Sequence, residues 1–278
     1  MKRWEKMQDV TETEFLRQVG IPWANFQTIL EKVMAYLDAE RRRNPRKTRG
    51  VKTSGLPVED RLLLTFYYLR HHPTFLNLAD VFGISESYAN KRYHEYLDIL
   101  AKVLRLPGHK ALLADEWLAI IIDVTEQPIE RPVDKQRQWY SGKKKRHTAK
   151  IQLIVCLFTL QILSVVFGKG RTHDFTLFKQ CGLHLAAALE KYGDAGYQGL
   201  DKLVANAFTP IKKPKDRELT PEERAYNRAL SKLRIRIEHV NRRCKIFRVT
   251  KEVYRGKHRH IHKTWTVVSA LVNYRYAE

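Results

Sequence analysis

Two apolar stretches constrain the fold of this chain most strongly. They are WLAIIIDV, residues 117–124, and IQLIVCLFTLQILSVVFG, residues 151–168. Both are rich in β-branched and aromatic residues, which favour strands, and the first is typical of a strand buried on both faces. The second has the length of a membrane helix, but polar side chains interrupt it: Gln152, Thr159, Gln161 and Ser164. We therefore expect a buried sheet, with IQLIVCLFT and ILSVVFG as antiparallel neighbouring strands.

The charge of the chain indicates its partner. The 278 residues include 51 Lys and Arg but only 30 Asp and Glu, a net charge of +21. Residues 1–116 hold 19 basic and 15 acidic side chains, whereas residues 117–278 hold 32 and 15. The positive electrostatic field of such a chain favours binding to a polyanion, usually nucleic acid. The alternative is a generally basic protein with no such partner. With 44% apolar and 29% charged residues, the composition excludes a disordered or fibrous chain.

The cysteine pattern and the first residues of the sequence indicate the cellular compartment of the protein. Cys156, Cys181 and Cys244 stand far apart with no CxxC pair. This pattern argues against a disulfide framework and a cysteine zinc site, and it suits a reducing compartment. Met1 is followed by Lys-Arg-Trp-Glu rather than by an apolar signal-peptide core. We expect a soluble, intracellular, cytoplasmic protein with no membrane partner.

The residues before the first buried strand have helical spacing. Residues 23–40 carry apolar side chains three and four apart, which predicts a helix. The basic segment RRRNPRKTRG, residues 41–50, follows as a solvated linker. Two interpretations of this linker stay open, contact with phosphate and a plain exposed loop.

Residues 57–100 are typical of a helix-turn-helix. Pro57 with two acidic residues begins one helix, and a short helix follows at residues 76–82. Gly83 permits a tight turn and Ser85 can cap a third helix that begins at Glu86. This third helix is expected to lie in the major groove. The residues predicted to face DNA are Glu86, Ser87, Asn90, Lys91 and His94, while Tyr88, Tyr93 and Tyr96 are expected to pack inside.

Further elements are expected after the two central strands. Residues 175–191 predict a helix, Tyr192 and Gly193 end a short strand, and AFTPIK is a further strand. Thr220-Pro221-Glu222-Glu223 is a capping box that begins a long helix running to about residue 247. A last helix is expected over residues 263–276.

Three carboxylates in basic surroundings point to metal-dependent chemistry. Asp123 and Asp194 are each expected to end a strand, and Glu238 lies on the long helix. Any one of them taken alone can be an ordinary surface acid. Phosphodiester cleavage needs a nucleophile at neutral pH and stabilisation of the leaving oxyanion, and two Mg²⁺ ions supply both. Mg²⁺ prefers oxygen ligands such as carboxylates.

Four blocks, in order, carry a family resemblance that spans residues 54–275. They are LPVEDRLLLTFYYLR…LADVFGISESYANKRY, IIIDVTEQPIERP, YGDAGYQGL and RIRIEHVNRRCKIFRV. The chain resembles DDE-type transposases of the bacterial insertion-sequence group related to the Harbinger-like nucleases. The resemblance implies a ribonuclease-H-like fold with Asp123, Asp194 and Glu238 as the metal-binding triad. Lys245, seven residues after Glu238, matches a basic residue that positions DNA phosphate in this family.

The resemblance extends to further residues. Arg234 matches an arginine of related enzymes, although the tyrosine that often precedes it is Ser231 here. Asp174 is an accessory acid or a helix cap, with the cap favoured, and Glu126 is the substitute if Asp123 is the wrong acid. His147 and His173 are read as structural histidines rather than phosphate contacts. The basic residues expected to hold DNA are Lys143, Lys144, Lys145, Arg146, Arg234 and Arg242.

Together these observations predict an α+β protein in three parts. Residues 1–52 form a helix and basic linker, residues 53–110 the helix-turn-helix, and residues 115–278 a ribonuclease-H-like mixed-sheet core. The predicted function is a bacterial, nucleoid-associated transposase that binds terminal inverted repeats. It would cleave and transfer strands with two Mg²⁺ ions, Mn²⁺ being able to substitute. The expected partners are repeat and target duplex DNA and further copies of the chain. The alternatives are a domesticated nuclease of the same fold and a non-catalytic helix-turn-helix regulator.

Overall fold

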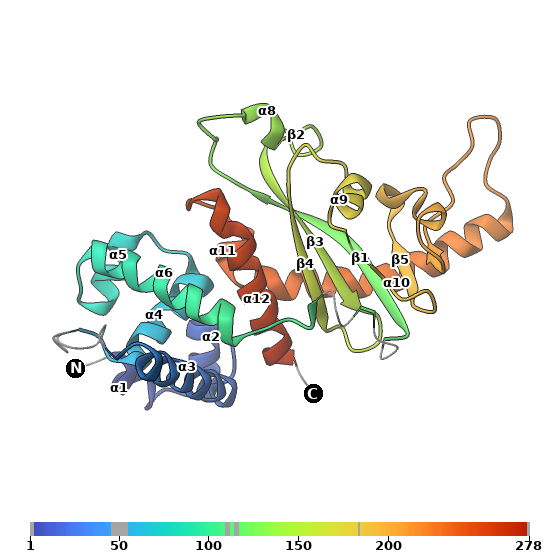
Figure 1. The fold of residues 1–278 in the computed structure, drawn as a ribbon. Coiled ribbons are helices and arrows are strands. Elements are labelled where there is room, and N and C mark those ends of the chain that lie inside the picture. Colours follow the sequence, from blue (N-terminus) through green and yellow to red (C-terminus); the bar gives the residue numbers. More distant parts are fainter. Residues whose placement is uncertain (1–2, 46–54, 109–111, 114–116, 183, 277–278) are drawn as a thin grey trace.

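The computed structural model describes residues 3–45, 55–108, 112–113, 117–182 and 184–276. A helical region formed by the first part of the chain lies beside a mixed sheet formed by the second part (Figure 1). The predicted domain limits at residues 52, 53, 110 and 115 fall outside the described residues. They therefore stay a prediction. No helix in the described ranges is long and apolar enough to cross a membrane.

The helical region is larger than the sequence pattern predicted. Two short helices, α1 and α2, precede the predicted one, and α3 includes the three arginines that we expected in the linker. Residues 44 and 45 follow α3, and the remaining linker residues, 46–50, lie outside the described residues. The helices are α1 (Arg3–Met7), α2 (Glu12–Val19), α3 (Trp23–Arg43), α4 (Val58–His71), α5 (Phe75–Phe82) and α6 (Glu86–Val103).

The predicted helix-turn-helix is present in α4, α5 and α6. Gly83 ends α5 with φ 63°, a left-handed conformation that glycine adopts without a steric penalty. Ser85 caps α6, since its hydroxyl accepts a hydrogen bond of 3.3 Å from the Tyr88 amide. Ala79 and Ala89 are both buried between the helices. Their small side chains allow the close approach that a helix-turn-helix needs.

The sheet of the second part has mixed pairing. Its central strand β1 lies antiparallel to β3 and parallel to β5; β4 pairs antiparallel with β3, and β6 pairs parallel with β5. The strands run in the order β2-β3-β1-β5-β6, with β4 also paired to β3, so the prediction of an α+β chain with a mixed sheet is confirmed. The strands are β1 (Ala119–Pro128), β2 (Tyr140–Ser141), β3 (Arg146–Cys156), β4 (Ile162–Lys169), β5 (Glu190–Gly193) and β6 (Ala207–Phe208).

The observed length of β1 shows that one prediction, the end of this strand at Asp123, is wrong. Asp123 does not end it, because pairing with β3 continues to Pro128. The polar residues after Asp123 can stay in the strand because Gln127, fully buried, is hydrogen-bonded. Its side-chain amide donates to the Val249 carbonyl at 2.6 Å, and its oxygen accepts from the Trp265 indole at 2.6 Å. A buried polar group is tolerated when it is paired in this way.

The helices of the second part are α8 (Gln136–Trp139), α9 (Asp174–Gln180), α10 (Pro221–Lys245), α11 (Arg248–Lys251) and α12 (Ile261–Tyr276). The capping box of α10 is confirmed, with Thr220 and Glu223 each bonded to the other's backbone amide. The helix predicted over residues 175–191 is wrong beyond Gln180. Gly182 has φ 59°, which a continuing helix does not allow, and Glu190 already belongs to β5. The predicted strand AFTPIK is reduced to the two residues of β6.

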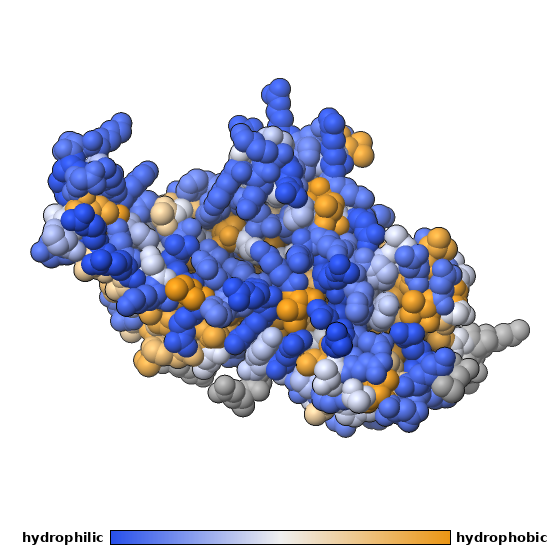
Figure 2. All heavy atoms as spheres, turned by 180° about the vertical axis from the view of Figure 1, so that it is seen from behind, coloured by the Kyte–Doolittle hydropathy of each residue, from blue (hydrophilic) through white to orange (hydrophobic). Residues whose placement is uncertain are grey.

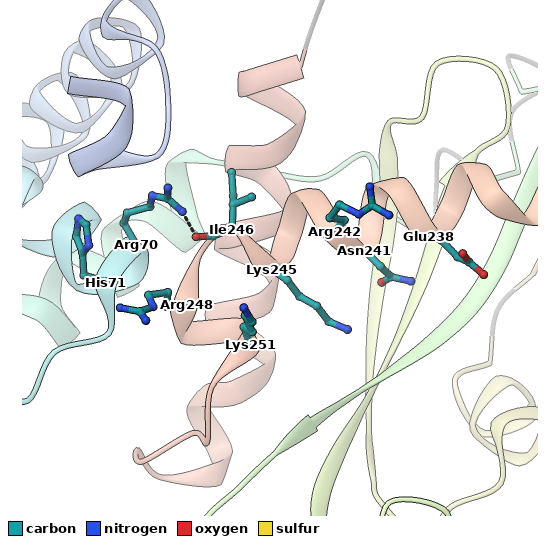
Figure 3. A pocket seen from close by; sticks show the side chains of 9 residues that line it. All are labelled: Arg70, His71, Glu238, Asn241, Arg242, Lys245, Ile246, Arg248 and Lys251. Carbon is teal, nitrogen blue, oxygen red and sulfur yellow. Dashed lines mark hydrogen bonds between the residues drawn. The ribbon is translucent and has the colours of Figure 1, made fainter. Parts of the chain in front are cut away.

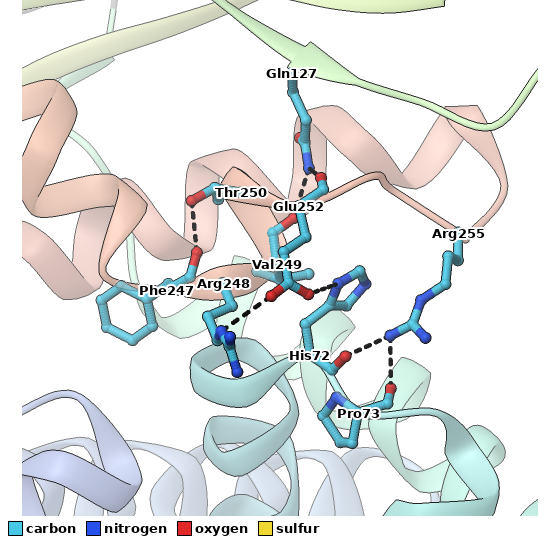
Figure 4. A network of polar contacts seen from close by, with 9 residues as sticks. All are labelled: His72, Pro73, Gln127, Phe247, Arg248, Val249, Thr250, Glu252 and Arg255. Atoms are coloured by element: carbon cyan, nitrogen blue, oxygen red, sulfur yellow. Dashed lines mark hydrogen bonds and ion pairs between the residues drawn. The ribbon is translucent and has the colours of Figure 1, made fainter.

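A polar network ties the helical region to the sheet (Figure 4). His72, at the end of α4, bonds through Nδ1 to the Glu252 carboxylate at 3.2 Å. Arg255 donates to the His72 and Pro73 carbonyls. Gln127 of β1 also donates to the Glu252 carbonyl at 3.2 Å. Helix α12 packs on both α6 and β4, so the two parts share one core.

Candidate active site

Strand register brings Asp123 and Asp194 together. Ile122 pairs with Gly193 where β1 and β5 run parallel. Asp123 is the next residue of β1, and Asp194 is the residue directly after the end of β5. Both carboxylates line one hollow at this end of the parallel pair. Neighbouring parallel strands place equivalent residues side by side. The two acids predicted from the sequence are therefore adjacent in space.

The YGDAGYQGL segment has the glycines that this arrangement needs. A β-carbon on Gly196 would lie 2.9 Å from Asp194 Oδ1 and 3.1 Å from Asp174 Oδ2, so a side chain there would displace the Asp194 carboxylate. The Gly196 amide donates to Asp194 Oδ1 at 2.8 Å. A β-carbon on Gly193 would meet the buried Tyr197 ring at 2.9 Å. These contacts fix the position of Asp194.

Burial makes Asp123 unusual among the carboxyl groups of the chain. It raises the pKa of Asp123 to about 6, and the negative charge of Asp194 adds to this rise. The Arg234 guanidinium and a hydrogen bond from Asn241 act in the opposite direction. Arg234 belongs to α10, and its guanidinium Nη2 lies 3.9 Å from Asp194 Oδ2. The net effect at Asp123 is that its neutral, protonated form is favoured relative to an ordinary aspartate.

Helix α10 contributes two further polar groups. Asn241, which the sequence analysis missed, donates from Nδ2 to Asp123 Oδ2 at 2.9 Å. Its Oδ1 is buried and has no hydrogen-bond partner in the described part of the chain. Lys245, one turn further on, lines the same hollow as the aspartates. Burial and nearby Lys144 lower the pKa of Lys245, while Asp123 opposes this change.

Two further acids lie in the hollow. Asp174 does not cap α9 as expected: it is the first helical residue, and its Oδ1 accepts from Lys150 Nζ at 2.6 Å. Glu126 accepts from the Thr148 hydroxyl at 2.8 Å. His173 also lines the hollow, while His147 packs edge-on against the Tyr140 ring. Asp174 and Glu126 are therefore alternatives that any test of the triad must include.

Glu238 lies apart from the two aspartates. It is exposed on α10 and lines a neighbouring, basic hollow rather than the one around Asp123. Within the described ranges, no three His, Cys, Asp or Glu side chains are grouped closely enough to hold a metal ion. Figure 3 shows Glu238, Asn241 and Lys245 on one side of α10. The predicted triad is thus only partly gathered, with two of its three members together.

Comparisons with known proteins match both parts of the chain. Residues 122–273 match the family described as "DDE superfamily endonuclease", and residues 54–106 match "Helix-turn-helix of DDE superfamily endonuclease". A Microchaete diplosiphon protein, named as the probable transposase for insertion sequence element IS702, is 36% identical over 98% of both chains. The chain belongs to the DDE superfamily endonucleases. A Streptomyces albus G protein, named "Putative transposase for insertion sequence element IS112", is 27% identical over 76% of this chain and 78% of its own.

DDE superfamily endonucleases use divalent metal ions, and the residues of this endonuclease fit one in part. Asp123 and Asp194 offer hard oxygen ligands, and a bound cation would offset the burial and the Asp194 charge that together raise the pKa of Asp123. The unpaired Oδ1 of Asn241 is another oxygen of the same kind. Glu238 does not lie with this set. The donor set therefore fits a divalent ion at the aspartate pair.

The side chains predicted to contact DNA lie in several places on the endonuclease. Glu86, Ser87, Asn90 and Lys91 are exposed on α6, but His94 is partly buried against the rings of Phe75 and His260. The residues of the basic loop, Lys143, Lys144, Lys145 and Arg146, are all exposed, and the first two line the aspartate hollow. Arg242 is exposed on α10. The helix-turn-helix domain and the family together imply that the chain binds DNA.

Proposed function

We propose that this endonuclease is the transposase of a bacterial insertion element. It binds the terminal inverted repeats through the exposed face of α6 and cleaves and joins strands at Asp123 and Asp194. The observation that carries the proposal is the register of Ile122 with Gly193, which sets these two carboxylates side by side in a strongly basic part of the chain. The names of the two relatives support it.

Asp123, Asp194 and Glu238 are the proposed metal ligands. Glu238 precedes Asn241 by three residues and so shares its face of α10, the face that contacts Asp123. When bound, two Mg²⁺ ions supply an activated nucleophile and stabilise the charge of the leaving oxygen; Mn²⁺ would substitute. Asn241 holds the Asp123 carboxylate in a fixed orientation through its 2.9 Å hydrogen bond.

The basic residues around the hollow bind the DNA backbone. Lys245 lies beside Asp123, where its ammonium group can donate to a phosphate oxygen of the strand being cut. Lys143 and Lys144 enter from the loop before β3. Lys145, Arg146, Arg234 and Arg242 add positive charge, which supports binding but carries no sequence information. Recognition of the repeat therefore rests on α6.

The assembly and place of action follow from the reaction. Two element ends must be held together for strand transfer, so the active form is a homo-oligomer on DNA. The substrates are the terminal repeats and a target duplex within the bacterial nucleoid.

A cleavage assay on the gene's own flanking ends tests this function. Labelled duplexes that carry those ends are incubated with wild-type protein and with Asp194→Asn, in Mg²⁺ and in Ca²⁺. We expect nicking at the element end in Mg²⁺, lost in the variant, while both proteins still bind the duplex. A variant that binds but does not cut separates catalysis from recognition.

The same assay separates the alternatives. A domesticated nuclease would cut duplex DNA but would neither prefer the element ends nor join them to a target. A helix-turn-helix regulator would bind without cutting in any metal, and Asp194→Asn would change nothing. Either outcome would overturn the transposase proposal.

A further inference from the structure

A basic hollow lies between α4 of the helix-turn-helix region and helices α10 and α11. It has a volume of about 810 Å³. Figure 3 shows that it extends along α10, from Glu238 and Asn241 at one end to Arg70 and His71 of α4 at the other. Five cationic side chains line it: Arg70, Arg242, Lys245, Arg248 and Lys251. Glu238 is the one carboxylate in its lining.

The cations of this hollow are poorly neutralised. No carboxylate of the described chain lies within ion-pair distance of Arg242, Lys245 or Lys251, whereas Arg248 pairs with Glu252 at 2.9 Å. Burial lowers the pKa of Arg70, and the neighbouring charges of Arg275 and Arg248 lower it further. Of the five cations, Arg248 alone has a carboxylate partner in the described part of the chain, so the hollow carries an excess of positive charge that favours an anion.

Arg70 is held in place before any ligand arrives. Its guanidinium donates to the Arg17 carbonyl at 3.2 Å and to the Ile246 carbonyl at the end of α10. Carbonyl partners fix its orientation without cancelling its charge. His71 beside it bonds to the Gln18 carbonyl, and burial lowers its pKa, so the ring is neutral at pH 7. The fixed charge therefore comes from Arg70.

The basic hollow adjoins the aspartate hollow. Lys245 lines both of them, and Asn241 lines the basic one while its side chain touches Asp123. A strand whose phosphates lie along the basic hollow would pass directly from Lys245 to Asp123. A small anion would need only one or two of the five cations, whereas a phosphodiester backbone has a repeating charge that matches a row of them.

We propose that this hollow is a second DNA-binding site, separate from the face of α6, which holds the sugar-phosphate backbone next to the bond that is cut. Arg70 and Lys251 contact backbone phosphates and carry no sequence preference. The site couples recognition of the DNA to its cleavage, because α4 of the helix-turn-helix and α10 of the catalytic core both contact the same DNA strand. The position of these phosphates beside the cut bond rests on the proposed function.

Binding at different salt concentrations tests the site. The full-length chain is titrated with the labelled end duplex in Ca²⁺, so that no strand is cut. The test variant is Arg242→Ala/Lys251→Ala, because both side chains are exposed and neither pairs with a carboxylate. The matched control is Lys6→Ala/Lys202→Ala, which removes the same charge from exposed positions elsewhere. Each lost phosphate contact should reduce the slope of log K against log salt by about 0.9.

We expect a slope reduced by one to two units in the test variant, about equally for specific and unrelated duplexes, and an unchanged slope in the control. Replacing single phosphates beside the cut bond by neutral methylphosphonates should weaken binding of the wild type but not of the test variant. An unchanged slope and an unchanged methylphosphonate profile would overturn the proposal. Since no cleavage is measured, a protein that binds but never cuts would still show the expected loss.

Discussion

The side-chain amide of Asn241 donates a 2.9 Å hydrogen bond to Asp123 across 118 residues of sequence. It is the contact through which helix α10 reaches the central strand at the aspartate pair. The bond favours the charged form of Asp123, against the burial and the Asp194 charge that disfavour it. Asn241 thereby orients this half-buried carboxyl group and favours its ionised form.

Replacing Asn241 by leucine should raise the pKa of Asp123 above its value of about 6. The reason is that a hydrogen bond to the carboxylate stabilises its ionised form, and leucine cannot donate one. Carboxyl-carbon NMR titration of the metal-free protein measures this shift. Ser231→Ala, an exposed position on the same helix, serves as the control and should leave the titration unchanged. An unshifted or lower pKa in Asn241→Leu would refute the assigned role.

The raised pKa of Asp123 should also appear in the stability of the metal-free protein. Its folded pKa of about 6 lies above the ordinary 3.8, so folding loses stability as pH rises from about 4 to 6 and does not regain it above. Asp123→Asn removes this penalty. The variant should be more stable than wild type at pH 8, by up to about 3 kcal/mol, and nearly equal at pH 4. Urea unfolding at both pH values checks the difference; equal stability at pH 8 would contradict it.

Adding a divalent ion should reverse that ranking. An ion bound by Asp123 and Asp194 stabilises the folded wild type by mass action, whereas the variant has lost one ligand. Thermal unfolding at pH 8 with increasing Mg²⁺ or Mn²⁺ should therefore raise the Tm of wild type more than that of Asp123→Asn. An equal rise in the Tm of both proteins would show that the ion does not bind at Asp123.

Gly170 should tolerate no side chain, although its φ is ordinary. A β-carbon there would lie 2.5 Å from the Trp139 carbonyl oxygen and 2.6 Å from the Thr148 carbonyl oxygen, and backbone atoms cannot move aside easily. Gly170→Ala should destabilise the protein by about 1–3 kcal/mol. Gly142→Ala is the matched control, since a β-carbon there meets nothing within 4 Å and the residue lines the same hollow. Urea unfolding should show a lower free energy of unfolding for Gly170→Ala than for Gly142→Ala.

Gln127→Leu should weaken the packing of β1 against α11 and α12. The change leaves the buried Trp265 indole and the Val249 carbonyl without their partner, at a cost of about 1–3 kcal/mol each. The free energy of unfolding should fall by at least about 2 kcal/mol. Gln180→Leu, at an exposed site on α9, should be nearly neutral in the same denaturant titration. Equal unfolding midpoints would show that the network has little energetic effect.

Local signals in the sequence predicted the parts of the fold that depend on local chemistry. The capping box at Thr220 and Glu223 and the turn at Gly83 are confirmed because each involves residues within a few positions of one another. The second half of β1 was missed because Gln127 is satisfied by groups more than 120 residues away. Short helices α1 and α2 were missed because neither carries a long apolar repeat.

In the site, too, residues with a local sequence signal were predicted, and residues that depend on long-range contacts were not. Asp123 and Asp194 were found from their position after apolar runs and from the family resemblance, and the parallel register of β1 and β5 makes them neighbours. Asn241 carries no sequence signal, since its partner lies on another element. The ion pair between Asp174 and Lys150 likewise depends on how α9 packs on β3. Such contacts depend on how distant segments pack together, which cannot be predicted from the spacing of residues along the chain.

The identity of the catalytic acids is tested most directly by five single variants in one assay. Asp123→Asn, Asp194→Asn, Glu238→Gln, Asp174→Asn and Glu126→Gln are compared for Mg²⁺-dependent cleavage of the end duplex under single-turnover conditions. We predict that the first three each lose at least about a hundredfold in rate, equivalent to about 2.7 kcal/mol, while the last two stay within about tenfold of wild type. Cleavage at the wild-type rate by Glu238→Gln, with Asp174→Asn or Glu126→Gln inactive, would contradict the proposed triad.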